Sequence, residues 1–148
     1  MQNKMEQVDE EWVIETRGRG FHALDGRIAG WLEEIGAEHG WVHVFVPHTS
    51  ASVILQENAD PDVQRDILDF LERIVPDGDP VYRHSSEGAD DMSAHLRTML
   101  GQNQSSLPVR NGRLFLGTWQ GLFLFEHRKR PLLRRVLLGF VGRRNAGV

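Results

Sequence analysis

The spacing of the apolar residues changes repeatedly along the chain, between the two-residue alternation typical of strands and the three- and four-residue spacing typical of helices. Helical spacing predicts three helices, which cover about residues 23–39, 61–76 and 90–100. Asp60 and Pro61 strengthen the second of these predictions, because aspartate is a common N-cap and proline fits the first helical position. A chain with this pattern has to combine helices and sheet in one fold.

Short or alternating apolar runs predict strands around these helices, at residues 12–16, 41–46, 51–56, 107–109, 114–116, 122–125 and 134–141. Asn111-Gly112 lies between two of these runs and is a strong signal for a hairpin with a type I′ turn. The sequence therefore predicts an α+β fold, with a substantially antiparallel sheet and about three helices. We expect a flexible N-terminal tail over residues 1–11 and a single compact domain over residues 12–148.

The composition excludes several classes of protein. The chain has 148 residues, of which 40% are hydrophobic and 26% are charged, and this is typical of one globular domain. The absence of cysteine excludes disulfides, thiolate nucleophiles and cysteine-ligated zinc sites. No apolar run approaches the roughly 20 residues of a membrane helix, and the polar first residues do not resemble a signal peptide. We therefore expect a cytoplasmic protein that does not contact a membrane.

The net charge of −4 hides a strong asymmetry. Residues 110–148 carry nine Lys or Arg and one acid, a net charge of +8, whereas residues 1–109 carry a net charge of −12. A basic segment of this kind can bind nucleic acid or phosphate, or it can complement an acidic surface of the same domain or of a neighbouring subunit. Because no nucleic-acid motif and no interleaved aromatic residues accompany it, we expect no nucleic-acid partner.

Three side chains with useful chemistry lie close together around the third predicted helix. Asp91 and His95 are one helical turn apart, so they face the same side, and His84 in the preceding loop can fold back onto them. Imidazoles and a carboxylate suit zinc, with an open position for water or substrate. The same spacing also fits a carboxylate that merely orients a histidine at the edge of the core.

A turn rich in hydroxyl groups lies between two predicted strands. His48 is followed by Thr49 and Ser50, at a strand end where scaffolds often present catalytic groups. His48 is therefore a candidate for a third imidazole of the site, and Asn58 could support this loop from the second strand's end. A Ser50–His48–Asp91 triad is a further possibility that the spacing allows.

The segment Gly117-Thr-Trp-Gln-Gly121 and the nearby Glu126 form another group of candidates. Gln120 offers both a donor and an acceptor, and Trp119 offers a flat apolar wall, although a bulged hairpin with a core tryptophan fits the pattern equally well. Glu126 ends a very apolar run, so we expect burial to raise its pKa and make it a general acid or base.

Four segments of the chain resemble, in the same order, the YjbQ family, whose members are often labelled secondary thiamine-phosphate synthase enzymes. These segments are His48–Ser52, Glu57–Pro61, Glu87–Asp91 through His95, and Gly117–Gln120 with Glu126-His127. The resemblance extends from about Trp12 to Val141. It implies a compact α+β protein that assembles as a trimer, and a histidine-lined, metal-compatible pocket near the subunit boundaries.

The resemblance also implies roles for individual residues. His48, His84 and His95 match histidines of the family, and its polar site positions are matched by Asp91, Gln120 and Glu126. Many members carry asparagine and alanine just after the acidic position, where this chain has Met92 and Ser93.

These observations lead us to expect a metal-assisted enzyme with a weak, secondary thiamine-phosphate synthase activity, which joins a pyrimidine methyl diphosphate to a thiazole phosphate. Its partners would be a small phosphorylated metabolite and two further copies of the chain. Its cofactor would be a divalent metal, with zinc preferred, and its site residues would be as follows: metal ligands His48, His84 and His95; catalytic residues Glu126, Asp91 and Gln120; substrate-binding residues Thr49, Ser50, Trp119 and Asn58. Two alternatives remain, a metal-dependent hydrolase of a phosphorylated metabolite and a non-catalytic protein that binds a metal or an anion.

Overall fold

The predicted α+β architecture is confirmed by a computed structural model, which describes residues 4–145. Its helices are α1 (Asp25–Glu34), α2 (Pro61–Ile74) and α3 (Asp91–Leu100). Its strands are β1 (Glu6–Glu15), β2 (Gly20–Ala23), β3 (Ala37–Phe45), β4 (Ala51–Glu57), β5 (Gln104–Arg110), β6 (Arg113–Leu114), β7 (Gln120–Glu126) and β8 (Leu133–Arg144). No helix in the described part is long and apolar enough to cross a membrane.

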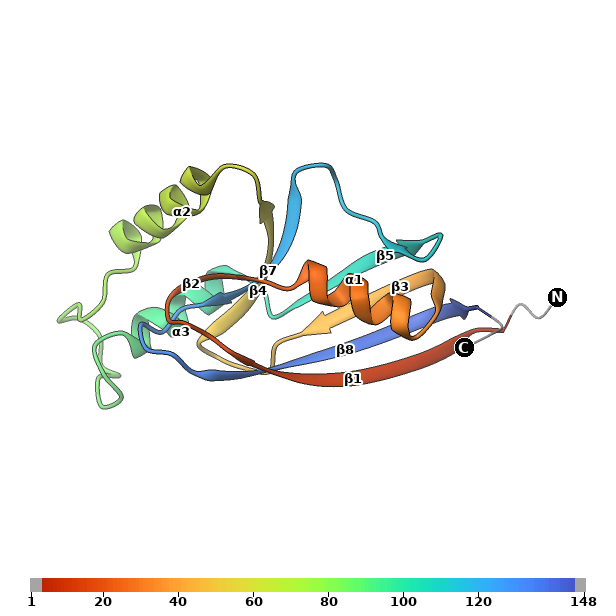
Figure 1. Ribbon diagram of the computed structural model, residues 1–148. Helices are drawn as coiled ribbons and strands as arrows, with labels where there is room; N and C mark the ends of the chain where they lie inside the picture. The colour runs from red at the N-terminus through yellow and green to blue at the C-terminus, as the bar shows by residue number, and fades with distance from the viewer. Residues whose placement is uncertain (1–3, 146–148) are drawn as a thin grey trace.

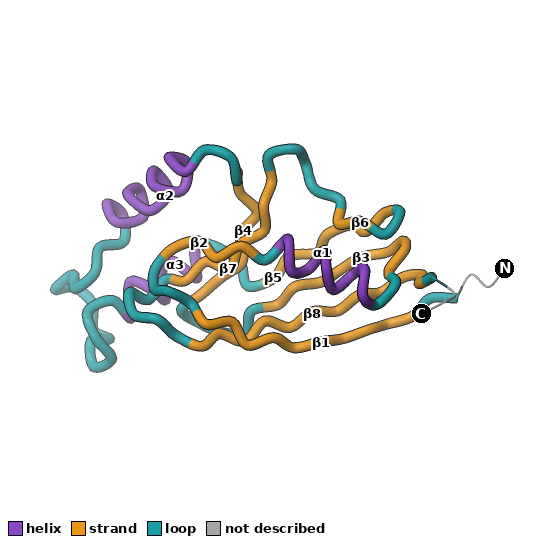
Figure 2. The backbone as a smooth tube through the Cα atoms, in the orientation of Figure 1, coloured by secondary structure: helices purple, strands orange, loops and turns teal. Residues whose placement is uncertain are grey.

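The strands form two antiparallel sheets (Figures 1 and 2). The larger sheet has the order β1-β8-β3-β5-β6, and the smaller one has the order β2-β7-β4. Helix α1 packs against the inner side of both sheets through Ile28, Trp31 and Leu32. These side chains belong to one apolar core, which also contains strand residues such as Val42 and Leu124. The core fixes the strand ends from which the site is built.

The first strand begins earlier than the sequence predicts. Residues 6–11, which we expected to be part of a flexible tail, pair with β8 from Glu6 opposite Gly142 onward. This part of β1 is mostly polar because β1 is an edge strand with one exposed face, so the apolar alternation that marks a strand begins only at Trp12. The expectation for residues 1–3 lies outside the described residues.

The first helix is shorter than predicted, because a glycine turn ends it. Helix α1 covers Asp25–Glu34, and Gly36 follows with a φ of 71°, a left-handed conformation that favours glycine. The chain then enters β3 at Ala37, so His39 and Gly40 lie in a strand and not at a helix end. A Cβ at Gly40 would lie 2.2 Å from the carbonyl oxygen of Val141 in the neighbouring strand, so glycine is required there by close packing.

The predicted helix cap and hairpin turn are confirmed, whereas the strand predicted at residues 114–116 is the shorter β6, which ends at Leu114. The Asp60 side chain accepts a hydrogen bond from the backbone N–H of Asp62 at the start of α2, as an N-cap does. In the hairpin between β5 and β6, Asn111 and Gly112 have φ values of 52° and 76°, as a type I′ turn requires. Helix α2 itself stands apart from the sheets in Figure 1, and of its residues only Leu71 is buried.

Candidate metal centre

Three side chains at the start of α3 converge on one point. Asp91 is the first residue of α3, and its Oδ2 lies 2.7 Å from Nε2 of His84 and 3.1 Å from Nε2 of His95. The three ligand atoms lie within 4.8 Å of one another, and in the described part of the chain no other group of three acidic or histidine side chains meets so closely. Asp91 is buried, whereas the His84 side chain is exposed, so the cluster opens to solvent on one side. The helical spacing that predicted the Asp91–His95 pair is confirmed.

A backbone hydrogen bond fixes which nitrogen of His95 carries its proton. Nδ1 of His95 lies 3.0 Å from the carbonyl oxygen of Thr49, and a carbonyl oxygen can only accept, so Nδ1 is the donor. In a neutral ring Nε2 is then an acceptor, yet it faces Oδ2 of Asp91, which is also an acceptor. A cation at this point, either a proton or a metal ion, removes the repulsion between them. Ligands of one tetrahedral zinc ion lie about 3.3 Å apart, so the 3.1 Å contact is close to that spacing, whereas the 2.7 Å contact is a hydrogen bond that would have to lengthen around the ion.

Arg128 holds the second oxygen of Asp91. Its Nη1 donates to Oδ1 of Asp91 at 2.7 Å, its Nε donates to Asp90 at 3.1 Å, and its Nη2 donates to the Glu87 carbonyl at 2.9 Å. Burial by itself would raise the pKa of Asp91, but the hydrogen bond from His84 and the charge of Arg128 together hold that pKa below its usual value. Asp91 is therefore a carboxylate at neutral pH, and it points at the two imidazoles. Nothing in the sequence pattern separated Arg128 from its basic neighbours, although it follows directly after Glu126-His127.

His48 does not belong to the cluster formed within this chain, so the structure does not bring this predicted ligand together with His84 and His95. Its Nε2 accepts a hydrogen bond of 2.8 Å from the backbone N–H of Arg135 in β8. Burial and the charge of Arg134 lower the pKa of His48, so the ring is a neutral acceptor in this contact. The loop still contributes to the site, because the next residue, Thr49, supplies the carbonyl that orients His95.

Glu126 is fully buried in an ion pair, contrary to the expectation that it is a general acid or base. Its carboxylate accepts from Nε and Nη2 of Arg134 at 2.7 and 2.5 Å and from the Thr16 hydroxyl at 2.9 Å. Burial alone would raise the pKa of Glu126, but the hydrogen bonds from Arg134 and the backbone N–H of Arg128 lower it below its usual value. The predicted rise in pKa is therefore wrong, because the sequence does not show the arginine that pairs with this acid.

Ser50 also belongs to this buried network. Its hydroxyl accepts a hydrogen bond of 2.9 Å from Nη2 of Arg134, and its carbonyl oxygen lies 3.1 Å from the same nitrogen. The side chain is buried, so Ser50 is engaged with Arg134 and is not presented to a substrate. The Ser50–His48–Asp91 triad does not form, because each of the three side chains is bonded elsewhere.

The remaining predicted residues lie at the far end of the smaller sheet. In β7, Gln120 and Glu126 are the first and last residues, which places them roughly 20 Å apart along the strand. Gln120 accepts from the Gly117 N–H at 2.8 Å, and Asn58 donates to the Gln120 carbonyl at 3.4 Å, so these residues form an exposed loop of their own. Trp119 is 62% exposed there and is not a core tryptophan. Within one chain, this loop does not meet the histidine cluster.

The sequence matches one family of proteins over most of its length. Residues 10–143 match the family model described as "UPF0047 protein YjbQ-like". The UPF0047 protein sll1880 of Synechocystis is 48% identical over 136 residues, which cover 92% of both chains. The UPF0047 protein YjbQ of Escherichia coli O157:H7 is 39% identical over 131 residues, which cover 88% of this chain and 94% of the relative.

Solved structures share the fold. An uncharacterized conserved protein of the YjbQ/UPF0047 family from Clostridium acetobutylicum is 34% identical, with a TM-score of 0.80 over 88% of this chain and 98% of the other. A hypothetical protein from Aeropyrum pernix, APE1520, is 29% identical, with a TM-score of 0.82 over 92% of this chain and 99% of the other.

Proposed function

This chain belongs to the YjbQ-like UPF0047 family, and from this premise we propose that it is a metal-assisted enzyme that acts on a small phosphorylated metabolite. One observation carries the proposal. Two histidine nitrogens and an ionised Asp91 oxygen converge at an open edge of the fold, and the proton on His95 is held away from the point where they meet. A cation at that point would remove the repulsion between Nε2 of His95 and Oδ2 of Asp91.

Zinc is the divalent metal that suits these ligands best. Two imidazoles and one carboxylate form a three-ligand set, which in zinc enzymes leaves a fourth position for water or substrate. Bound zinc would supply a Lewis acid for a phosphate or diphosphate oxygen. The Thr49 carbonyl and the Arg128 guanidinium orient His95 and Asp91, as outer partners of metal ligands do.

The arrangement of the acids favours transfer with loss of a diphosphate over hydrolysis driven by a general base. Both acids that we expected to act on protons are held by arginines, Glu126 by Arg134 and Asp91 by Arg128. Stabilising a leaving diphosphate needs positive charge and hydrogen bonds, which do not depend on a free carboxylate. This is the chemistry of the thiamine-phosphate synthase reaction implied by the family resemblance, so we keep that reaction as the leading candidate and the hydrolase as the alternative.

A turnover assay with matched histidine variants tests the proposed function. Zinc-loaded protein would be incubated with the pyrimidine methyl diphosphate and the thiazole phosphate, and in parallel with a panel of phosphorylated metabolites. We expect His95→Ala to reduce turnover by about 100-fold or more, because it removes a metal ligand. His48→Ala, which removes a histidine outside the cluster, should keep most of the activity. Tight binding of zinc and metabolite without any turnover would show a binding protein instead.

We also propose that the protein is a homotrimer. Several apolar side chains of the larger sheet are exposed, among them Trp41, Phe45 and Leu133, and contact between protomers would bury them. A cyclic trimer joins one surface to a different one, so the exposed Trp119 of one protomer can approach another protomer's cluster. Light scattering should give three times the 16.9 kDa mass of the chain at both low and moderate salt. A monomer at micromolar concentration under both conditions would contradict this assembly.

A further inference from the structure

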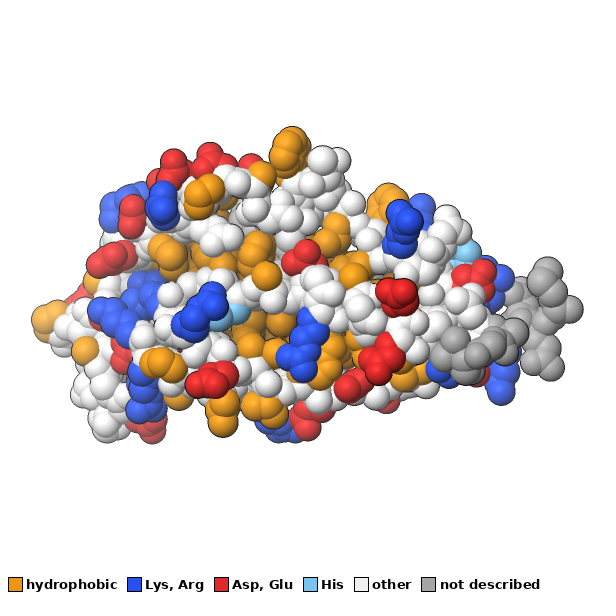
Figure 3. All heavy atoms as spheres, viewed as in Figure 1, with side chains coloured by type: hydrophobic (Ala, Val, Ile, Leu, Met, Phe, Trp, Pro, Cys, Tyr) orange, Lys and Arg blue, Asp and Glu red, His pale blue; other side chains and the backbone are white. Residues whose placement is uncertain are grey.

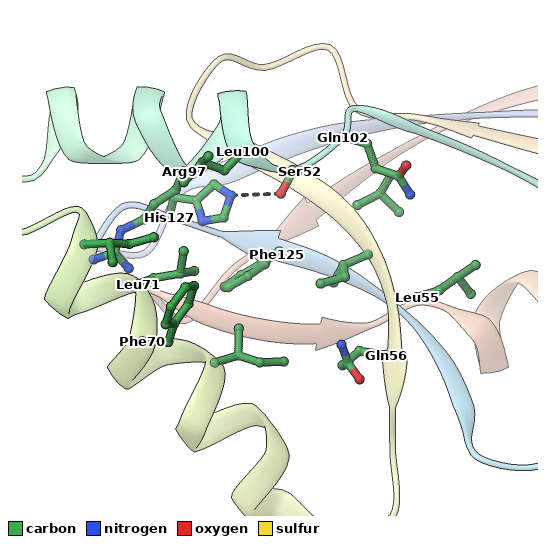
Figure 4. A pocket seen from close by; sticks show the side chains of 15 residues that line it. Ser52, Leu55, Gln56, Phe70, Leu71, Arg97, Leu100, Gln102, Phe125 and His127 are labelled. Atoms are coloured by element: carbon green, nitrogen blue, oxygen red, sulfur yellow. Dashed lines mark hydrogen bonds between the residues drawn. The ribbon is translucent and has the colours of Figure 1, made fainter.

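A cavity of about 690 Å³ lies between α2, the end of α3 and strands β4 and β7, on the other side of α3 from the histidine cluster. Its walls are mainly apolar and include Ile67 and Ile74, together with Leu55, Phe70, Leu71 and Phe125, which are labelled in Figure 4. Residues of helix α2 form one wall of this cavity, and Figure 3 shows apolar side chains gathered below this helix. The cavity has the size and the apolar lining that are typical of small-molecule sites.

Five polar side chains interrupt this apolar lining, and two of them, Arg97 and His127, are ionisable and almost fully buried. Arg97 and His127 are only 2% and 1% exposed, and both line the cavity next to each other in Figure 4. Nε2 of His127 is bonded to the Ser52 hydroxyl at 2.8 Å, but its Nδ1 has no partner, and neither does Nε of Arg97. Four buried side-chain atoms in the described part of the chain lack a hydrogen-bond partner, and two of them lie here. Buried polar atoms are normally satisfied, so these two indicate a missing partner.

The charge of Arg97 is also unmatched at short range. Its Nη2 donates to the Val75 carbonyl at 3.2 Å, a neutral acceptor. The nearby carboxylate of Asp77 is already bonded by Arg19 and Ser93 and paired with Lys129. A buried guanidinium normally pairs with an anion, because burial without one is costly.

The two faces of α3 separate this cavity from the metal centre. Asp91 and His95 are one turn apart and point to the cluster, whereas Arg97 and Leu100 lie on another face and line the cavity. A ligand in the cavity would therefore not be the ligand of the metal, and the inference does not depend on the proposed function.

We propose that this cavity binds a small organic carboxylate, whose apolar body lies between α2 and β4 and whose carboxylate meets Arg97 and His127. A carboxylate supplies the anion that the guanidinium lacks, and its two oxygens can also accept from an imidazole N–H. Burial and the charges of Arg97 and Arg19 lower the pKa of His127 to about 3, so this ring is neutral and can offer Nδ1–H while Nε2 accepts from Ser52. The apolar walls select a ligand with a hydrocarbon chain or ring over a small inorganic anion.

Calorimetric titration with octanoate and octanol tests the proposal, because these probes share one chain length and differ in charge. We expect octanoate to bind at one site per chain, and we expect the affinity for octanol to be lower by about tenfold or more. Arg97→Gln should weaken octanoate by about tenfold or more and leave octanol nearly unchanged. Arg65→Gln is the matched control, since Arg65 lies on the exposed side of α2 and pairs with Asp62. Thermal unfolding of each variant establishes that it is folded.

A second variant pair keeps the test independent of Arg97. Ile74 is 50% exposed at the cavity wall, so Ile74→Glu would place a negative charge beside the ligand with little effect on the core. It should weaken octanoate more than the neutral Ile74→Gln does. Equal binding of octanoate and octanol, or unchanged octanoate binding in Arg97→Gln, would overturn the proposal. The proposal would also be overturned if octanoate did not bind, or if octyl phosphate bound more tightly than octanoate. It would be overturned as well if light scattering showed that octanoate releases a second copy of the chain from the cavity.

Discussion

Replacing Glu126 with glutamine is expected to lower the free energy of unfolding by about 3–5 kcal/mol, the usual cost of breaking a buried ion pair from one side. The variant leaves the Arg134 guanidinium buried at 5% exposure without its counter-ion. It also weakens the hydrogen bonds that the carboxylate accepts from Thr16 and from the backbone N–H of Arg128. Urea unfolding at pH 7 would measure the loss, with Glu72→Gln on the exposed side of α2 as a control that should change by less than about 0.5 kcal/mol.

The pH dependence of this difference follows from the lowered pKa of Glu126. Because the folded-state pKa lies below the ordinary value of 4.5, the stabilisation is fully present above that value and is lost as the pH falls through the lower folded-state pKa. The gap between wild type and Glu126→Gln should therefore stay constant from pH 5 to 8 and close in acid. A variant of unchanged stability that has lost only its turnover would show instead that Glu126 acts on a proton.

The Glu126–Arg134 pair also has a positioning role. Arg134 donates to the carbonyl and the hydroxyl of Ser50, and the neighbouring Thr49 carbonyl fixes the proton on His95. The buried ion pair thus holds the loop whose Thr49 carbonyl orients His95.

Much of the fold could be predicted from the sequence because it depends on local pattern. Helical spacing and the Asp60-Pro61 cap predicted the position of α2 to within two residues, and Asn111-Gly112 predicted the hairpin turn. The early start of β1 could not be predicted, because pairing with β8 and not apolar alternation defines its first half. The end of α1 depended on the left-handed conformation of Gly36, and Gly40 offered an equally plausible stop.

Some of the site residues could likewise be predicted from local pattern, and others could not. Asp91 and His95 could be paired from helical spacing alone, and His84 could be placed with them because its loop is short. The direction of the His48 side chain could not be predicted, since it depends on the register of β8 and on the Arg135 backbone. The arginines that hold the two acids are distant in sequence or lie in a uniformly basic segment, so pattern did not reveal either pairing.

The length of β7 explains why Trp119 and Gln120 do not lie near Glu126 and the histidine cluster. Trp119 and Gln120 were grouped with Glu126 because all three lie near one strand in sequence. A seven-residue strand nevertheless separates its ends by roughly 20 Å, so one chain cannot bring them together at the cluster. Their place in a shared site therefore depends on the proposed trimer.

Zinc titration of metal-free protein at pH 7.5, followed by elemental analysis, is the most direct test of the metal centre. We predict one zinc ion per chain, with affinity reduced by about 100-fold or more in His95→Ala and Asp91→Asn. His48→Ala should bind zinc within about threefold of the wild type, since His48 is bonded to Arg135. Zinc binding that survives His95→Ala but is lost in His48→Ala, or no zinc binding by the wild type, would contradict the site formed by His84, Asp91 and His95.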